Sequence, residues 1–372
     1  MNLQTVNLKD NENIKVHGRT IESRDPVRLM WSGSAIELNV KCSELYIDLE
    51  SCYLEYENWI SVMINGSFMA RQMLKKGRDT VCIFRGRNPE KVTNVRIIKD
   101  VQAMNADAEH CINVYAVQLD GEILPVNERP VKMEFIGDSI TSGEGTIGTG
   151  PDEDWLSMFF CHPFSYPYMV AQKLNADYRV ISQSGWGVYS SWDNNPFCAI
   201  PLYYEKICGV APGEKFKVLG FHDENDFSAW QPDMICVNLG TNDDGAFHNE
   251  AFTDPDTGKI YKLRMEGENY VREDIIKVRD AVINFLKTLR KNNPDAKIYW
   301  CFGILGDAMA PVIREGIDIY QKESGDEKID FIVLPNTDES TVGSRMHPGY
   351  YAHAKAADVI AERLSSYILN KI

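Results

Sequence analysis

Residues 131–139, Val-Lys-Met-Glu-Phe-Ile-Gly-Asp-Ser, decide the fold of this chain. The largely apolar run 131–136 predicts a buried β-strand, and Gly137-Asp138 ends it abruptly. A serine placed where a buried strand stops can present its hydroxyl at the edge of a sheet. A base can reach it there, and backbone N–H groups can face a developing oxyanion. Ser139 is therefore a candidate nucleophile, although the tripeptide alone is a weak signal and in most places forms a turn or a helix N-cap.

After Pro130, apolar strand-like runs alternate with helical segments. The pattern predicts strands over 131–136, 178–183, 233–239, 297–303 and 329–333, and helices over 164–175, 269–292, 308–323 and 348–370. Such alternation is typical of a three-layer α/β fold, a mostly parallel sheet with helices on both faces. In folds of this kind, ligands bind beyond the carboxyl ends of the strands.

The first third of the chain has a different pattern. Short runs alternate apolar and polar residues with a period of two, as in 35–40, 45–49 and 59–64. This alternation, with turn signals close by, predicts an antiparallel β-sandwich. A chain of 372 residues is also long for a single core. We therefore expect a sandwich domain over residues 1–128 and an α/β domain over 129–372.

The bulk properties of the chain exclude several classes of partner. A formal net charge of −15 argues against nucleic acid or an anionic membrane. The N-terminus has no signal-peptide pattern, and no apolar stretch approaches the length of a membrane span. Nine scattered cysteines without CxxC spacing are typical of reduced, buried thiols. These features predict a cytoplasmic protein, although a chain trimmed of its leader would show the same pattern.

The sequence predicts neither a metal nor a cofactor. No set of His, Cys and Asp residues has the spacing of a zinc site. Residues 143–148, Gly-Glu-Gly-Thr-Ile-Gly, match the pattern G-x-G-x-x-G. A dinucleotide-binding loop should open a helix directly after a strand, whereas this run begins seven positions after Ile136.

Other polar groups follow the predicted strands of the α/β half. His347 precedes Pro348 at the start of the last helix, and a histidine suits proton transfer near neutral pH. Asn242 follows the run 233–239, and its side-chain amide can donate to an oxyanion. Gly185 and Gly187 follow another strand, where a glycine lets the backbone approach a substrate closely. Each residue alone is as typical of an ordinary loop, but all can meet at one edge of the sheet.

These blocks resemble those that define the SGNH (GDSL-like) hydrolases. The matching residues, in chain order, are Gly137-Asp138-Ser139, the glycines 185 and 187, Gly240-x-Asn242-Asp243 and His347-Pro348. The N-terminal stretch, with Val16-His17-Gly18-Arg19-Thr20 and Met30-Trp31-Ser32-Gly33-Ser34, is similar to the jelly-roll domain of carbohydrate esterase family two. That resemblance implies a jelly-roll sandwich ahead of an SGNH domain, in a serine esterase that removes O-acetyl groups from plant polysaccharides.

The resemblance also implies roles for individual residues. Ser139 would be the nucleophile and His347 the base. The oxyanion donors would be the backbone N–H of Ser139, the backbone N–H of Gly187 and the side chain of Asn242. Counting from the preceding strand favours Gly187 over Gly185 for the second donor.

The sequence departs from the family at the acid of the triad. The family usually has an aspartate three residues before the histidine, where this chain has Ser344. Such an acid holds the imidazole tautomer and stabilises the imidazolium. We expect either a backbone carbonyl to orient His347, giving a Ser–His dyad, or Asp338 or Glu339 to reach it from upstream.

Aromatic residues in these loops suit a carbohydrate substrate. Trp186 and Trp192 lie within and just after a predicted loop at the sheet edge, so we expect them to contact a sugar, although many such residues are core residues. The resemblance, together with these aromatic residues, implies an acetylesterase of the acetyl xylan or mannan type. Two alternatives remain: an esterase or thioesterase acting on another small acyl ester, and a non-catalytic carbohydrate-binding protein. The oligomeric state is left open.

Overall fold

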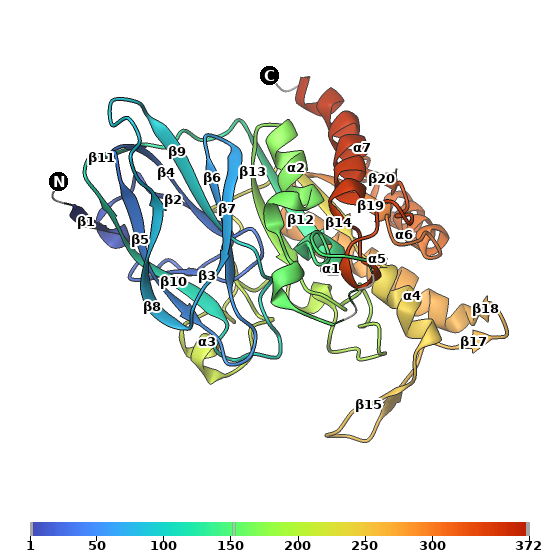
Figure 1. Cartoon of the computed structure of the whole chain (residues 1–372). Coiled ribbons are helices and arrows are strands. Elements are labelled where there is room, and N and C mark those ends of the chain that lie inside the picture. The colour runs from blue at the N-terminus through green and yellow to red at the C-terminus, as the bar shows by residue number, and fades with distance from the viewer. Residues whose placement is uncertain (1–2, 151, 153, 370–372) are drawn as a thin grey trace.

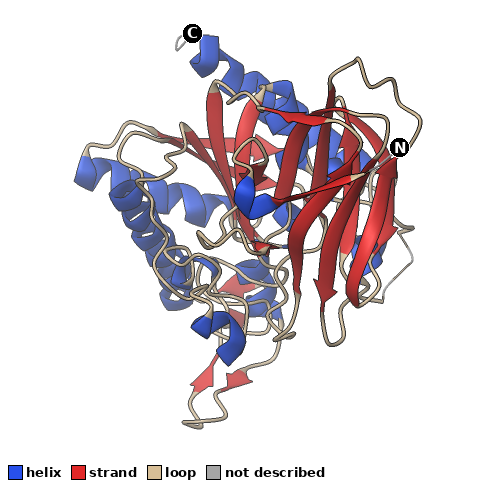
Figure 2. Ribbon diagram, turned by 90° about the vertical axis from the view of Figure 1, so that its left-hand side faces the viewer, coloured by secondary structure: helices blue, strands red, loops and turns tan. Residues whose placement is uncertain are grey.

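The computed structural model describes residues 3–150, 152 and 154–369. The described part of the chain begins with an antiparallel sandwich and ends in the last helix of a separate α/β domain (Figure 1). Seen from the side, the strands of the sandwich occupy one side of the molecule and most of the helices the other (Figure 2). The prediction of a β-sandwich followed by a three-layer α/β fold is confirmed.

The sandwich consists of two packed antiparallel sheets. One has the strand order β1-β10-β5-β8, with β3 also pairing β10, and the other has the order β11-β4-β9-β6-β7, with β2 also pairing β4. On β5, buried and half-buried residues alternate, because one face of the strand packs on the opposite sheet. The strands are β1 (Gln4–Asn7), β2 (Lys15–His17), β3 (Val27–Leu29), β4 (Ala35–Lys41), β5 (Leu45–Cys52), β6 (Trp59–Ile64), β7 (Ser67–Met73), β8 (Gly77–Phe84), β9 (Thr93–Lys99), β10 (Cys111–Leu119) and β11 (Glu122–Leu124).

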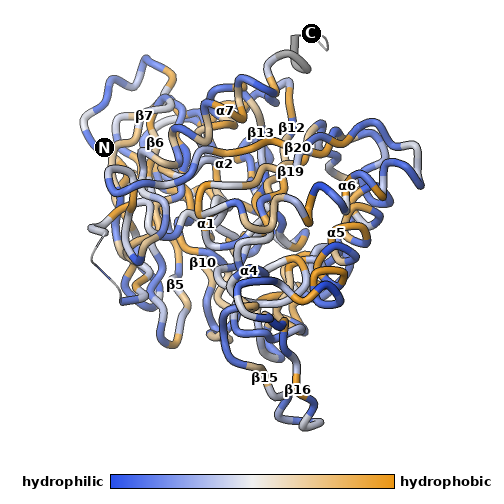
Figure 3. Tube along the Cα trace, turned by 90° about the vertical axis from the view of Figure 1, so that its right-hand side faces the viewer, coloured by the Kyte–Doolittle hydropathy of each residue, from blue (hydrophilic) through white to orange (hydrophobic). Residues whose placement is uncertain are grey.

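The α/β domain is built on a five-stranded parallel sheet of order β13-β12-β14-β19-β20. Its strands are β12 (Val131–Gly137), β13 (Ala176–Ser182), β14 (Met234–Asn238), β19 (Lys297–Gly303) and β20 (Ile329–Leu334). They are largely buried and rank among the most hydrophobic segments of the trace (Figure 3). A continuous apolar run is expected of a parallel strand covered on both faces.

Helices cover both faces of this sheet. Apolar residues of α2 (Tyr166–Lys173) and α7 (Tyr350–Leu369) pack on one face, and those of α5 (Arg272–Asn292) and α6 (Ala310–Ser324) on the other. No helix in the described part of the chain is long and apolar enough to cross a membrane.

The structure also contains short elements that the sequence pattern did not predict. They are the helices α1 (Ser139–Ser142), α3 (Glu214–Val218) and α4 (Thr241–His248), and two hairpins formed by β15 (Phe252–Thr253) with β16 (Ile260–Tyr261) and by β17 (Met265–Glu266) with β18 (Asn269–Tyr270). These elements are too short for a periodic signal. The β15–β16 hairpin projects away from the body of the molecule (Figure 1).

Buried polar contacts fix the two domains to each other. The Arg129 guanidinium lies 2.9 Å from a carboxylate oxygen of Glu37 in the sandwich and 2.8 Å from one of Asp177 on β13. Nearby, Arg19 of the sandwich pairs with Glu134 on β12 at 3.0 Å. Buried charges need such partners, so these pairs specify one arrangement of the domains. Any site between the domains therefore has walls held in fixed positions.

Candidate active site

Ser139 lies where β12 ends in a tight turn. Asp138 caps α1, because its Oδ1 accepts the backbone N–H of Ile140 at 3.0 Å. A side chain at Gly137 would bring its Cβ within 2.0 Å of the Thr141 hydroxyl oxygen, so the turn requires glycine there. Ser139 is the first residue of α1, and its N–H has no acceptor within the helix. The turn presents the hydroxyl and this N–H at the carboxyl edge of the sheet.

His347 contacts Ser139 directly. The Ser139 Oγ–H donates to Nε2 of His347 at 2.9 Å, and the Nδ1–H of the same ring donates to the backbone carbonyl of Arg345 at 2.9 Å. The carbonyl can only accept, so it fixes the tautomer whose Nε2 lone pair faces the serine. Arg345 and Met346 have φ angles of 54° and 57°, and this left-handed turn aims the Arg345 carbonyl back at the ring.

The structure therefore has a Ser–His pair oriented by a backbone carbonyl. The alternative prediction, that Asp338 orients His347, is wrong. Asp338 is exposed, and its Oδ1 accepts the N–H of Ser340 at 2.9 Å and the hydroxyls of Ser340 and Thr341. These hydrogen bonds, that of the Ser340 side chain above all, lower the pKa of Asp338 to about 2. Ser344 is buried, and its Oγ lies within hydrogen-bond distance of the carbonyl oxygens of Ile147 (3.2 Å) and Thr149 (3.3 Å).

The glycine-rich run 143–148 packs against the histidine loop. A Cβ at Gly145 would lie 2.6 Å from the Cβ of His347, and one at Gly343 would lie 1.8 Å from the carbonyl oxygen of Gly145. Gly145 also has a φ of +74°, which favours glycine. The pattern G-x-G-x-x-G in this chain thus serves the close approach of two loops rather than the binding of a dinucleotide.

The prediction of Gly187 as an oxyanion donor is wrong. Its N–H donates to the carbonyl of Ser190 at 2.9 Å, and a Cβ there would point at the Asp243 carboxylate. Gly185, by contrast, lines the same pocket as Ser139 and Asn242. Counting from the strand failed because the direction of a backbone N–H depends on turn dihedrals that the count does not contain.

Asn242 is held at the pocket by two acceptors. Its Nδ2 donates to Oδ2 of Asp138 at 3.2 Å and to the carbonyl of Trp186 at 3.1 Å. Burial raises the pKa of Asp138 to about 7. Asp243, whose pKa is raised by burial to about 6, accepts backbone N–H groups from residues 188–190. The two aspartates thus fix the turns around Ser139 and the loop after β13.

Sequence reasoning missed Glu144. Its carboxylate is buried, with Oε1 at 3.1 Å from Nε of Arg345 and 3.8 Å from Nε2 of His347. The Ser184 hydroxyl donates to Oε2 at 2.6 Å. Its only signal in the sequence is its position as an acidic residue between two glycines, five positions after Ser139, within a run that does not fit a dinucleotide motif.

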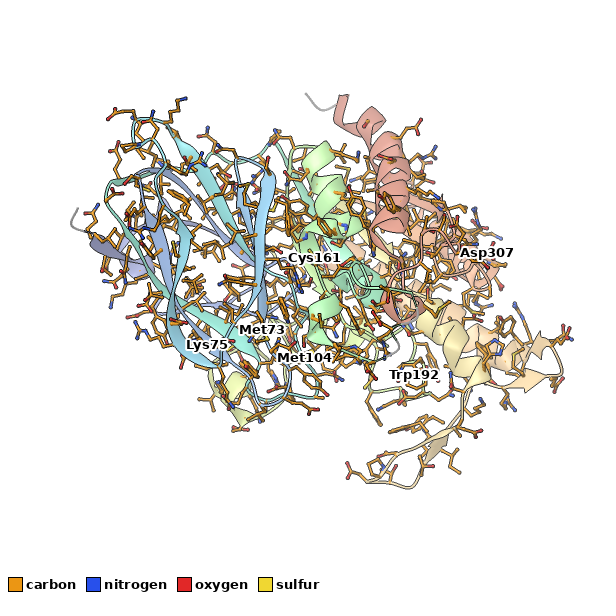
Figure 4. All side chains as sticks on the ribbon, in the orientation of Figure 1. Met73, Lys75, Met104, Cys161, Trp192 and Asp307 are labelled. Carbon is orange, nitrogen blue, oxygen red and sulfur yellow. The ribbon has the colours of Figure 1, made fainter. Side chains whose placement is uncertain are left out.

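These residues line a pocket of about 480 Å³ between the two domains. The sandwich contributes Tyr56, Gln102, Met104, Asn105 and Ala106 to its walls, and Met104 lies on the same side of the molecule as Trp192 (Figure 4). Gln102 also reaches beneath the pocket, where its Oε1 accepts the backbone N–H of Ser184 and the hydroxyl of Ser142, each at 2.8 Å. The sandwich thus holds the loop that carries Gly185.

The two predicted tryptophans have different environments. Trp192 lines the pocket and is 50% exposed. Trp186 is only 5% exposed and packs against the ring of Tyr203, with the centroids 5.0 Å apart. Its prediction as a substrate contact is wrong, because the indole points from the loop into the hydrophobic core.

Among the described residues, no group of three or more His, Cys, Asp or Glu side chains is placed to hold a metal ion. The groups that line the pocket include the Ser139 hydroxyl, the His347 imidazole, the Asn242 amide and the Glu144 carboxylate. A serine hydrogen-bonded to a histidine beside N–H donors is the arrangement of a nucleophile, its base and an oxyanion site.

Known proteins are similar to this chain in both sequence and fold. Residues 16–126 match the family described as carbohydrate esterase 2 N-terminal. The structure of an acetyl xylan esterase, Est2A, from the rumen bacterium Butyrivibrio proteoclasticus is 43% identical in sequence, with a TM-score of 0.97 over 98% of both chains.

Two curated relatives are more distant. The cellulase/esterase CelE of Acetivibrio thermocellus is 27% identical over 98% of this chain, and the acetylxylan esterase / glucomannan deacetylase of Cellvibrio japonicus is 26% identical over 62% of it. The chain spans 40% and 61% of the lengths of these two relatives.

Proposed function

We propose that this chain, which belongs to carbohydrate esterase family two, is a serine esterase that removes O-acetyl groups from oligosaccharides and polysaccharides. The observation that carries the proposal is the Ser139–His347 pair, with 2.9 Å between Oγ and Nε2 and the tautomer fixed by the Arg345 carbonyl. This pair is ready to transfer a proton from the hydroxyl to the ring in the first step.

Acylation begins with attack of the Ser139 oxygen on the acetyl carbonyl carbon. His347 takes the hydroxyl proton on Nε2, and the carbonyl oxygen becomes an oxyanion. When the tetrahedral intermediate collapses, the C–O bond to the sugar breaks, and the same Nε2–H protonates the leaving sugar hydroxyl. The acetyl group then remains on Ser139 as an ester, and the ring is neutral again.

The oxyanion needs donors that are already in place. We assign this role to the backbone N–H of Ser139 at the start of α1, the backbone N–H of Gly185 and the side-chain amide of Asn242. All three residues line the pocket. The Asn242 amide donates to Asp138 and to the Trp186 carbonyl in the resting structure, so one of these two hydrogen bonds is exchanged for the oxyanion during the reaction. Gln102 supports the same site from the sandwich, through the N–H of Ser184.

Deacylation repeats these steps with water. Nε2 of His347 accepts a proton from a water molecule as its oxygen attacks the acetyl carbon, and the proton then passes to Ser139 as acetate leaves. Trp155 and Trp192 line the same pocket as Ser139, where the water and the sugar would bind.

The family and the pocket support an acetylated carbohydrate as the substrate. The structural relative is an acetyl xylan esterase, and a curated relative is named for both xylan and glucomannan deacetylation. The half-exposed indole of Trp192 offers an apolar face of the kind on which a sugar ring stacks. We therefore favour acetylated xylan or mannan over another small acyl ester, and a reactive site over a purely sugar-binding one.

The test compares acetate release from acetylated xylo- and manno-oligosaccharides by the parent protein and by Ser139→Ala. We expect the parent to release acetate and the variant to lose at least about 1,000-fold in kcat. Equal inactivity of both proteins, with sugar binding intact, would contradict the esterase. Faster turnover of acyl thioesters than of acetyl sugars would instead favour the small-ester alternative.

A further inference from the structure

Glu144 has an unusual place in the proposed mechanism. Nδ1 of His347 donates to a neutral carbonyl, so no carboxylate balances the ring from that side in the described structure. On the other side, Oε1 of Glu144 lies 3.8 Å from Nε2, the nitrogen that gains the proton. The carboxylate is almost fully buried, with 3% of its side chain exposed.

Two hydrogen bonds hold this carboxylate in position. Arg345 donates to Oε1 at 3.1 Å, and the Ser184 hydroxyl donates to Oε2 at 2.6 Å. Ser184 is fixed in turn, because its backbone N–H donates to Gln102 of the sandwich at 2.8 Å. The carboxylate therefore does not have to move or shed water when the charge on the ring changes, which is the condition for electrostatic stabilisation by a preorganised group.

The charge of the ring differs between the resting state and the transition state. In the resting pair, His347 is neutral and accepts the serine proton, so a nearby carboxylate gains little from it. In the transition state, the ring becomes an imidazolium, and its attraction to a fixed negative charge is strong in a largely buried site. An interaction that is stronger in the transition state than in the ground state accelerates the reaction.

We propose that Glu144 stabilises the imidazolium form of His347 from the Nε2 side, in place of a carboxylate at Nδ1. The inference rests on the proposed esterase function and adds a residue to it. Arg345 joins the two halves of this device: its backbone carbonyl orients the ring, and its guanidinium positions the carboxylate. The resulting arrangement is a Ser–His pair whose acid comes from the loop that follows the nucleophile.

The test is Glu144→Gln, which keeps the size of the side chain and one acceptor oxygen for Arg345 while removing the charge. Its amide nitrogen can donate to the Ser184 hydroxyl, which is able to accept. The substrate is 4-nitrophenyl acetate, which has no sugar hydroxyls, so loss of a sugar contact cannot account for an effect. We expect kcat to fall about 10- to 100-fold, because the imidazolium of the transition state loses one stabilising charge interaction. KM should stay nearly unchanged. The acid limb of the kcat/KM profile should also move to lower pH.

Asp338→Asn is the matched control, because it also removes a carboxylate that lies near His347 in the sequence. In the described structure that carboxylate makes no contact with His347. The variant should retain parental kcat and the parental pH profile. If Glu144→Gln keeps the parental kcat, or loses kcat without moving the acid limb, Glu144 is only structural and the inference is wrong.

Ser139→Ala, measured beside these variants, separates this inference from the proposed function. An active Ser139→Ala contradicts the esterase mechanism itself. An inactive Ser139→Ala beside a fully active Glu144→Gln contradicts only the role of Glu144. Thermal unfolding of Glu144→Gln identifies a folding defect. In that case Ser184→Ala, which releases Oε2 but keeps the charge, should lower kcat less than Glu144→Gln and leave the acid limb in place.

Discussion

The two domains contribute to the pocket in different ways. The α/β domain carries the groups that we propose to react: Ser139 follows β12 and begins α1, and His347 lies in the loop before α7. The sandwich contributes Tyr56 and the loop around Gln102 to the walls, and the side chain of Gln102 holds turns of the other domain. Local turns present the reacting groups, and contacts between distant parts of the chain hold those turns in position. Substitutions in the two domains should therefore change kcat and the free energy of unfolding to different extents.

Gly145→Ala tests the α/β side and should have the largest effect of the three variants considered next. The new Cβ would lie 2.6 Å from the Cβ of His347 and 2.6 Å from the carbonyl oxygen of Ser344, so the histidine loop must shift. A displacement of about 1 Å at a reacting group costs on the order of 100-fold in rate. We expect kcat on 4-nitrophenyl acetate to fall by about that factor, measured in steady-state assays.

Gly86→Ala is the control for backbone strain. Gly86 has a φ of +75°, close to the +74° of Gly145, but no atom lies within 4 Å of its added Cβ. Both variants should lose a similar amount of stability from the positive φ, of the order of 1 kcal/mol. An unchanged kcat in Gly145→Ala would mean that the contact between the two loops does not position His347.

Gln102→Leu tests the sandwich side and should have a smaller effect. Leucine removes the acceptor for the Ser184 N–H and the Ser142 hydroxyl, so the loop that carries Gly185 loses its anchor. We expect kcat to fall about tenfold and the free energy of unfolding to fall by about 1–3 kcal/mol, because buried donors lose their partner. The measurements are steady-state kinetics and urea unfolding.

Asn58→Leu separates the two effects of Gln102→Leu. Asn58 is a buried amide of the sandwich, and its Nδ2 donates to Ser51, Cys52 and Cys111, all within the same domain. Its loss should lower stability while kcat stays at the parental value. A loss of activity in Asn58→Leu equal to that in Gln102→Leu would make the sandwich a general support rather than a specific one.

The same contrast explains what the sequence could predict. Period-two and strand–helix patterns predicted both folds, and the end of β12 predicted the position of Ser139, because these signals are local. The pairing of Ser139 with His347 spans 208 residues, and it was reached only through a resemblance to a known family.

The errors have a common physical origin. Gly187 and Trp186 lie in the predicted loop, but the N–H of one and the indole of the other point away from the pocket. Glu144 was missed because its partners, Ser184 and Arg345, are remote in sequence. Residue type and spacing locate a loop, whereas side-chain direction and long-range polar contacts depend on the packing of the whole chain.

Lys99→Met tests the buried ammonium group that holds the sandwich loop next to the pocket. It should have the smallest effect of the three variants, measured as a change in the free energy of unfolding. Lys99 ends β9, and its Nζ donates to the carbonyls of Val101 and Gln102, which begin the loop that enters the pocket. Burial lowers the pKa of this ammonium from 10.5 to about 7. Between these values, the unfolded chain holds a proton that the folded chain has lost, so this group makes the protein more stable as pH rises and adds no further stabilisation above pH 10.5.

One proton taken up on unfolding corresponds to about 1.4 kcal/mol per pH unit. The free energy of unfolding of the parent, relative to Lys99→Met, should therefore increase by about 1 kcal/mol between pH 7.5 and 8.5, as measured by urea unfolding. A difference that stays constant over this interval would mean that Lys99 keeps its proton in the folded sandwich. The loop beside the active site would then be anchored by a buried charge rather than by a neutral amine.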